Sequence, residues 1–142
     1  MERLMICESL KLENQLCFPL YAASREILRK YTPLLKKINL TYTQYIVMMV
    51  LWEKSELTVG ELGKKLYLDT GTLSPLLKAM EEKGLLERNR SKADERIVTV
   101  KITEKGEELQ KEAMSVPEEM GKCIHLEAGE AKALYGLLYK LL

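Results

Sequence analysis

Residues 66–78 decide the fold, and they read Leu66-Tyr67-Leu68-Asp69-Thr70-Gly71-Thr72-Leu73-Ser74-Pro75-Leu76-Leu77-Lys78. Apolar residues recur here at three- and four-residue steps, which predicts a helix from about residue 72 to residue 83. In such a helix Pro75 fits only near the first turn, where its missing donor costs little. A shorter helix is expected over residues 58–66, and capping residues fill the connection between the two. The stretch therefore predicts a helix-turn-helix over about residues 58–83.

The pattern changes period after Gly84, which is a good helix stop. Residues 86–90 and 96–102 alternate between apolar and polar, with a polar connection between them, and this predicts a two-stranded hairpin. A helix-turn-helix followed by a hairpin makes a winged helix-turn-helix, with the wing over about residues 86–102. Its second helix would enter the major groove of DNA.

Small hydroxyls and cations are the side chains that contact phosphates and base edges. On the second helix the candidate DNA-binding residues are Thr70, Thr72, Ser74, Pro75 and Lys78. On the wing they are Arg88, Arg90, Lys92, Asp94 and Arg96, with Asp94 expected to pair with a basic residue and fix the wing. An arginine at a wing tip suits a narrow minor groove. The plainer interpretation is an amphipathic helix followed by a solvated hairpin.

Helices are expected on both sides of this unit. Periodic apolar residues predict a helix over residues 8–31, with a kink or interruption at Pro19, a break at residues 32–33 and a short helix over residues 33–38. Thr41 with Gln44 three residues later predicts a capping box for the next helix. After Thr103 a long helical region should follow, interrupted at Pro117 and ending in an apolar helix over residues 131–142.

The bulk properties fit one soluble domain. The chain has 142 residues, a net charge of +1 and 46% hydrophobic residues, so we expect one domain over residues 1–142, mainly α with a small β wing. Residues 8–40 and 104–142 would form dimerisation helices around the winged helix-turn-helix of residues 41–103. With neither a run of 18 apolar residues nor a signal peptide, we expect no membrane contact and a cytoplasmic location.

Several separate blocks resemble one known family. Residues 66–78, followed by Asp94-Glu95-Arg96, resemble the MarR family of winged-helix regulators. Two further blocks are similar to its organic hydroperoxide resistance regulator branch: Leu12-Glu13-Asn14-Gln15-Leu16-Cys17-Phe18 and Leu40-Thr41-Tyr42-Thr43-Gln44-Tyr45. The resemblance implies a homodimer with interlocking terminal helices that binds an inverted-repeat operator in double-stranded DNA and represses a nearby peroxidase gene. The leucines of residues 134–142 independently favour dimerisation, unless they close the chain's own core.

Cys17 is the candidate redox-active residue. A thiol attacks peroxide only as thiolate, and no Lys, Arg or His lies within four residues, so the hydroxyl of Tyr21, one turn on, is a candidate donor. The resemblance implies further donation by Tyr31 and Tyr42 of the other subunit. It also implies that Cys123, after Val116-Pro117, is the partner's resolving cysteine, although a small thiol could cap Cys17 instead. The alternatives are a small buried cysteine and ordinary core tyrosines.

The sequence thus predicts a repressor that releases DNA when organic hydroperoxide oxidises Cys17, a peroxide class favoured by apolar Leu16, Phe18 and Leu20. One alternative is a MarR-type repressor released by a small phenolic or lipophilic ligand. Another is a thiol peroxidase, although the chain has no cofactor motif and we expect neither a cofactor nor enzyme activity. A third is a zinc site at Cys123 and His125, whose spacing is poor for structural zinc.

Overall fold

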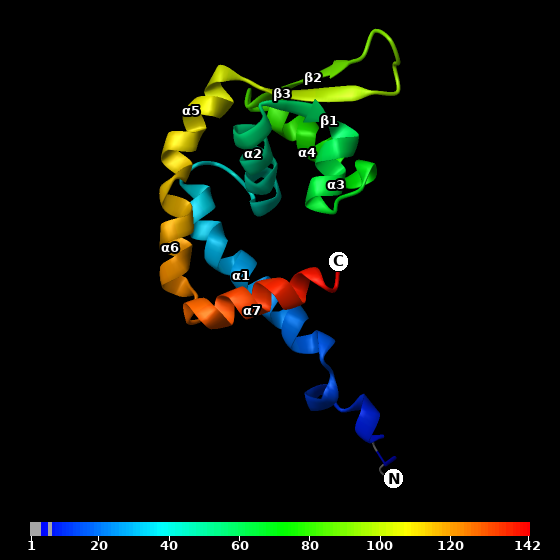
Figure 1. The fold of residues 1–142 in the computed structure, drawn as a ribbon, viewed down its shortest axis with the longest axis vertical. Helices are drawn as coiled ribbons and strands as arrows, with labels where there is room; N and C mark the ends of the chain where they lie inside the picture. Colours follow the sequence, from blue (N-terminus) through cyan, green and yellow to red (C-terminus); the bar gives the residue numbers. More distant parts are fainter. Residues whose placement is uncertain (1–3, 6) are drawn as a thin grey trace.

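The structure, a computed structural model, describes residues 4–5 and 7–142. Its elements in chain order are the 3₁₀ turns η1 (Glu8–Leu10) and η2 (Leu12–Asn14), α1 (Cys17–Lys36), α2 (Tyr42–Lys54), β1 (Glu56–Thr58), α3 (Val59–Leu66), α4 (Thr70–Glu82), β2 (Leu86–Arg90), β3 (Val98–Ile102), α5 (Glu104–Ala113), α6 (Ser115–Cys123) and α7 (Ala128–Tyr139). Figure 1 shows α2, α3, α4 and the strands gathered at one end, with α1 running away from them toward the N-terminus. None of the described helices is long and apolar enough to cross a membrane.

The winged helix-turn-helix is present as predicted. Side chains cap the starts of its helices: Thr41 and Gln44 form the predicted capping box of α2, Thr58 and Glu61 form one for α3, and Asp69 accepts a 2.7 Å bond from the Thr72 N–H at the start of α4. These bonds satisfy N–H groups that have no partner inside the helix. The turn between α3 and α4 is closed by Tyr67 in the left-handed conformation.

The wing belongs to a three-stranded antiparallel sheet of order β1-β3-β2. Leu57 pairs with Val100 and Leu86 with Ile102, so apolar side chains of all three strands face the helices. The predicted hairpin is confirmed, although its second strand begins at Val98 rather than at residue 96. β1 is an addition that the sequence did not reveal. The helices α2, α3 and α4 pack on this sheet around a core that includes Leu51, Leu62, Leu73, Leu77 and Met80.

The predicted helix over residues 8–31 is wrong at both ends. Residues 8–14 form η1 and η2, and α1 begins only at Cys17, so Pro19 lies in its first turn. A first-turn residue has no intrahelical partner for its N–H, and Pro19 therefore needs neither a kink nor an interruption. At the other end α1 continues through Pro33 to Lys36, so residues 33–38 are not a separate helix. Asn39, with φ 54°, ends the run instead.

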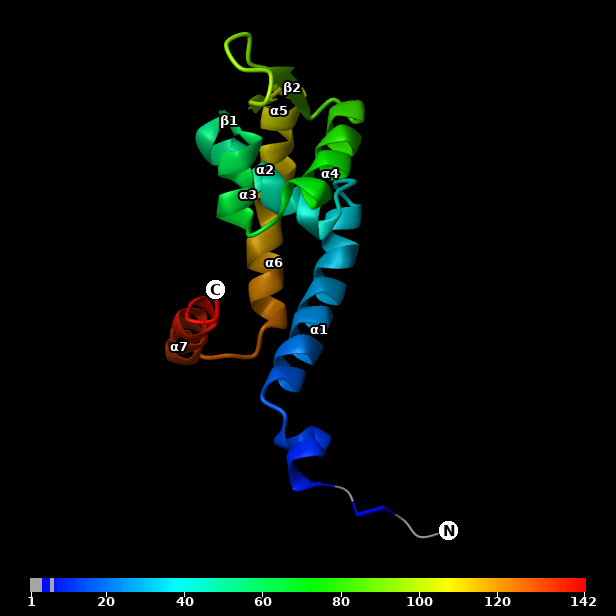
Figure 2. The ribbon, with the colours of Figure 1, turned by 90° about the vertical axis from the view of Figure 1, so that its right-hand side faces the viewer.

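The remaining prolines also lie elsewhere than expected. Because α4 begins at Thr70, Pro75 is its sixth residue and lies beyond the first turn, on the exposed side of the helix. The C-terminal helical region breaks at Met114 and not at Pro117, which is the third residue of α6 and again occupies a first turn. The last helix, α7, spans Ala128–Tyr139 instead of residues 131–142. Figure 2 shows α7 standing apart from α1.

Candidate nucleic-acid interface and thiol site

The predicted DNA-binding residues of α4 share its exposed side. Leu73, Leu77 and Met80 are buried and fix the helix against the core. The exposed residues are Thr70, Thr72, Ser74, Pro75 and Lys78. Burial of one face thus presents three hydroxyls and one ammonium together. The Thr72 backbone N–H, which donates to Asp69, holds the pKa of the Asp69 carboxyl below its ordinary value, so the helix cap stays ionised at neutral pH.

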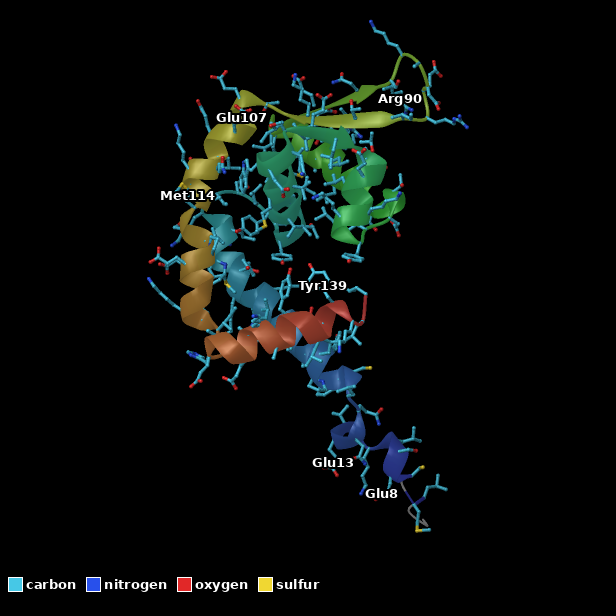
Figure 3. The ribbon with its side chains drawn as sticks, in the orientation of Figure 1. Glu8, Glu13, Arg90, Glu107, Met114 and Tyr139 are labelled. Atoms are coloured by element: carbon cyan, nitrogen blue, oxygen red, sulfur yellow. The ribbon has the colours of Figure 1, made fainter. Side chains whose placement is uncertain are left out.

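The wing residues are organised by hydrogen bonds inside the hairpin. Asp94 pairs with Arg96 through two 3.1 Å bonds, which confirms the predicted pairing, and Arg96 holds the pKa of Asp94 below its ordinary value. The side chain of Arg96 is nevertheless 90% exposed. Arg90 donates to the carbonyl of Glu95 at 3.0 Å and lies on the wing (Figure 3). Lys92 is exposed in the loop between the strands.

Arg88 behaves differently from the other wing arginines. It is partly buried, and both its backbone N–H and its guanidinium donate to Glu81 of α4, at 2.8 Å and 3.1 Å. The Arg88 backbone N–H is the main reason that the pKa of Glu81 lies below its ordinary value. This pair fixes the base of the wing to α4, a contact that the sequence analysis missed because seven residues and a change of element separate the two.

A hollow of about 450 Å³ lies between α4 and the wing. Its lining combines hydroxyls of α4 with guanidinium groups of the wing, contributed by Thr70, Ser74, Arg88, Arg90 and Arg96. The capped start of α3, at Thr58 and Gly60, adds to the same hollow. Guanidinium, hydroxyl and helix N-terminal groups are the donors that bind phosphate oxygens. The arrangement therefore suits an anionic backbone lying between α4 and the wing.

Cys17 lies at the exposed start of α1. It is the first residue of the helix, and in the single chain its side chain is exposed. The N-cap residue, Leu16, gives no side-chain cap, which leaves N–H groups of the first turn facing outward. The apolar neighbours Leu16, Phe18 and Leu20 are exposed as well. An apolar molecule can approach the sulfur here.

Tyr21 points toward a cation that the sequence analysis did not consider. Its hydroxyl accepts a 3.3 Å bond from Arg25, whose guanidinium carbon lies 5.6 Å from the ring centroid. No hydrogen bond joins Tyr21 to Cys17 among the described side chains. Arg25 is eight residues after Cys17, about two helical turns further along α1, so a search for cations within four residues of the thiol does not find it. A search extended to two helical turns would find this cation.

Tyr31 and Tyr42 form a close pair far from Cys17 in the same chain. Their ring centroids are 4.8 Å apart, and Tyr45 lies behind them at 5.9 Å and 6.4 Å. Burial is the main cause that raises the pKa of both Tyr31 and Tyr42, so both hydroxyls stay protonated and able to donate. Tyr31 follows Cys17 by fourteen residues on α1, about 21 Å along a helix axis. One chain cannot bring the pair to its own Cys17.

Cys123 is the last residue of α6 and is partly buried. α6 packs along α1, where Val116 and Met120 are buried and fix its orientation. Cys7, Cys17 and Cys123 are all free thiols in the single chain. The structure thus places one thiol at the start of α1 and another at the end of the helix that packs against it.

The family is evident from comparison with known proteins. Residues 29–113 match the family described as transcriptional regulator SarA/Rot. The chain is 47% identical to the organic hydroperoxide resistance transcriptional regulator of Bacillus subtilis (strain 168), over 95% of this chain and 92% of that protein.

Solved structures agree. The chain is similar to reduced AbfR bound to DNA, with 33% identity, a TM-score of 0.77 and 95% of both chains covered. Its likeness to disulfide-formed AbfR has 34% identity, a TM-score of 0.67 and 94% of both chains covered; AbfR is a protein of Staphylococcus epidermidis. A mutant MarR from E. coli in complex with operator DNA matches at 27% identity and a TM-score of 0.73, over 90% of this chain and 99% of that one. The chain therefore belongs to the SarA/Rot and MarR-type winged-helix family of DNA-binding transcriptional regulators.

Proposed function

We propose that this protein is a homodimeric repressor that releases its operator when an organic hydroperoxide oxidises Cys17. One observation carries the proposal. Cys17 is exposed at one end of α1, whereas the protonated Tyr31–Tyr42 pair lies about 21 Å away at the other end. An antiparallel second copy of α1 would bring the tyrosine pair of each subunit to the thiol of its partner. The name of the Bacillus relative and the reduced and disulfide states of AbfR support the same chemistry.

Dimerisation is supported by the apolar surface of the terminal helices. Large apolar side chains are exposed along α1 as far as Leu28, along α7 and in the segments on both sides of α7: Phe18, Leu20, Tyr21, Leu28, Ile124, Leu126, Leu134, Tyr135, Leu137, Tyr139, Leu141 and Leu142. Exposed apolar areas of this extent mark interaction surfaces. A second copy is the occupant that also completes the thiol site.

The proposed oxidation follows ordinary thiol chemistry. The Cys17 thiolate attacks the terminal oxygen of the hydroperoxide, an S–O bond forms, the O–O bond breaks, and the alkoxide takes a proton and leaves as an alcohol. Cys17 is now a sulfenic acid. The thiol of Cys123 of the partner subunit attacks this sulfur, an S–S bond forms, and water leaves. Two thiols are oxidised by two electrons, and the hydroperoxide is reduced to alcohol and water.

DNA binding in the reduced state would use α4 and the wing of each subunit. Thr70, Thr72, Ser74, Pro75 and Lys78 would meet the major groove, while Arg90, Lys92 and Arg96 would contact the backbone or minor groove. Asp94 would orient Arg96, and Arg88 would act mainly by fixing the wing through Glu81. Two such faces in a dimer would read an inverted repeat in double-stranded DNA. An intersubunit disulfide would change the spacing of the two faces.

The test is a fluorescence-anisotropy titration of the DNA upstream of the protein's own gene, before and after one equivalent of cumene hydroperoxide. We expect tight binding by reduced protein, loss of binding after oxidation, and recovery with dithiothreitol. Cys17→Ser should bind and ignore the hydroperoxide, while Cys7→Ser, a matched thiol control, should respond like wild type. A Cys17→Ser protein that still lost its DNA on oxidation would contradict the proposal. Cys123→Ser, examined on non-reducing gels, separates an intersubunit disulfide from capping by a small thiol.

A ligand-released repressor is the second candidate. A hollow of about 330 Å³ between α1 and the start of α2 has apolar Leu28, Leu35 and Leu40 on its lining together with Tyr42 and the cations Lys36 and Lys83. Its size and chemistry suit a small phenolic or lipophilic anion. Induction by such a ligand would survive Cys17→Ser, which distinguishes it from the thiol switch. Catalytic turnover of hydroperoxide with a dithiol reductant would instead indicate a thiol peroxidase.

A further inference from the structure

Lys83 joins the end of α4 to the junction between α1 and α2. Its ammonium donates to the Asn39 carbonyl at 2.7 Å and to the Gln44 side-chain oxygen at 2.9 Å. Together these two bonds form the Lys83 bridge. Lys83 lies 44 positions after Asn39 and 39 positions after Gln44 in the sequence. Among the described side-chain hydrogen bonds, only these two connect α4 or its C-cap to this junction.

The acceptor end of the bridge flanks Tyr42. Asn39 ends the α1 run in a left-handed conformation, and Gln44 closes the capping box of α2 by accepting the Thr41 N–H at 3.1 Å. Tyr42, whose ring contacts that of Tyr31 at a tilt of 53°, lies between them as the first residue of α2. Gln44 is 6% exposed, so its oxygen is held in place by the core. Both acceptors of Lys83 thus lie within three residues of Tyr42 in the chain.

The donor end belongs to the proposed DNA-reading helix. Lys83 is the C-cap of α4, and its backbone N–H bonds to the Ala79 carbonyl. The Lys83 carbonyl accepts a 2.7 Å bond from Lys105. The ammonium of the bridge is therefore attached, through the lysine side chain, to the C-cap position of α4. α4 lies above the C-terminal end of α1 in Figure 2.

We propose that Lys83 is a positioning residue that transmits the state of the thiol from the Tyr31–Tyr42 pair to α4. This inference rests on the proposed function, in which these tyrosines donate to the partner's Cys17. Oxidation changes the acceptor of the tyrosine hydroxyls from a thiolate to a sulfenic acid or disulfide. The start of α2 would move with Tyr42, and the Lys83 bridge would carry this movement to α4. Both bonds of the bridge come from an ammonium, and charge-assisted bonds are about twice as strong as neutral ones.

The test compares the ratio of the DNA dissociation constants after and before oxidation by cumene hydroperoxide in four proteins. Lys83→Met keeps the aliphatic stem and removes the donors. Lys83→Arg keeps donors and charge. Lys105→Met is the matched control, because Lys105 bonds at the same corner but does not reach the α1–α2 junction. The rate of Cys17 oxidation, followed by thiol titration, is measured alongside.

We expect Lys83→Met to oxidise at the wild-type rate while its affinity ratio falls at least about threefold, a size typical of residues that modulate coupling. Lys83→Arg should restore the ratio, and Lys105→Met should leave it unchanged. A Lys83→Met protein with the wild-type ratio, whatever its reduced affinity, would overturn the inference alone. A wild-type protein whose affinity ignores hydroperoxide would overturn the proposed function as well. If Lys83→Met does not fold, Lys83→Ala, which also removes the donors, takes its place, and the same two results support or overturn the inference.

Discussion

The winged helix-turn-helix and the terminal helices bury their apolar residues in different ways. In the first region Leu51, Leu62, Leu73 and Met80 are buried within one chain, and capping side chains close its helix starts. In the second region, α7 has no buried residue at all, although many of its residues are apolar. The winged region thus has its core within one chain, whereas the terminal helices leave apolar side chains exposed that a second copy would cover in the proposed dimer. In the proposed switch, this separation would let oxidation alter the spacing of the two winged regions without unfolding either.

Leu62→Ala should have the largest effect, on the stability of the winged region itself. Leu62 is fully buried where α3 packs on the core, so removing its side chain leaves a cavity. We expect a loss of about 2–5 kcal/mol in the free energy of unfolding. Urea denaturation followed by circular dichroism measures it. The loss should be the same at low and high protein concentration, and a strong concentration dependence would show that this region is not complete in one chain.

Leu137→Lys should act on the second region instead. Leu137 is 58% exposed on α7, and a lysine there would place a charge in the proposed dimer interface. We expect the dimer dissociation constant to rise about tenfold or more, which corresponds to about 1.4 kcal/mol. Sedimentation equilibrium gives the constant. Lys132→Ala, on the exposed surface of the same helix, should leave it unchanged, and an unaltered dimer in Leu137→Lys would remove α7 from the interface.

Lys78→Ala should weaken DNA binding without changing either core. Lys78 is exposed on α4 beside the proposed major-groove hydroxyls. If it contacts a phosphate, affinity should drop several-fold for all sequences alike, and the slope of log K against log salt should fall by about one. Anisotropy titrations at several salt concentrations give both numbers. Lys111→Ala, on α5 away from the wing, is the control, and equal slopes for the two variants would contradict a phosphate contact at Lys78.

Local signals in the sequence were enough to predict the winged region. The Thr41–Gln44 capping box, the three- and four-residue apolar steps of α4 and the alternation of the wing each depend on neighbours within a few residues. β1 was missed because three residues carry no alternation, and its pairing with β3 depends on contacts more than 40 residues away. Pro19 and Pro117 misled because each lies in the first turn of its helix, where a missing N–H breaks no intrahelical bond. Pro33 lies inside α1, and the helix continues past it to Lys36.

In the candidate site too, features set by neighbouring residues could be predicted, and features set by distant contacts could not. The hydroxyls of α4 and the exposed arginines of the wing could be predicted, since each lies at a position that the local pattern exposes. The Arg88–Glu81 pair and the Lys83 bridge could not, because both join an end of α4 to another element and depend on where that helix ends. The exposure of Cys17 also depended on a helix boundary, because α1 begins at Cys17 instead of enclosing it.

Glu81→Gln should give the smallest effect, visible as a change with pH. Bonds from Arg88 lower the pKa of Glu81 in the folded state, so its contribution to stability is full above the unfolded pKa of about 4.3 and is lost as pH falls through the lower folded value. The variant should therefore melt below wild type at pH 7, by a small amount because the side chain is 37% exposed, and the difference should vanish near pH 2–3. Thermal melts at both pH values measure this. Glu82→Gln, exposed on the neighbouring position, should differ from wild type at neither, and a Glu81→Gln deficit that persists in acid would show that the wing is held to α4 by shape instead of by charge.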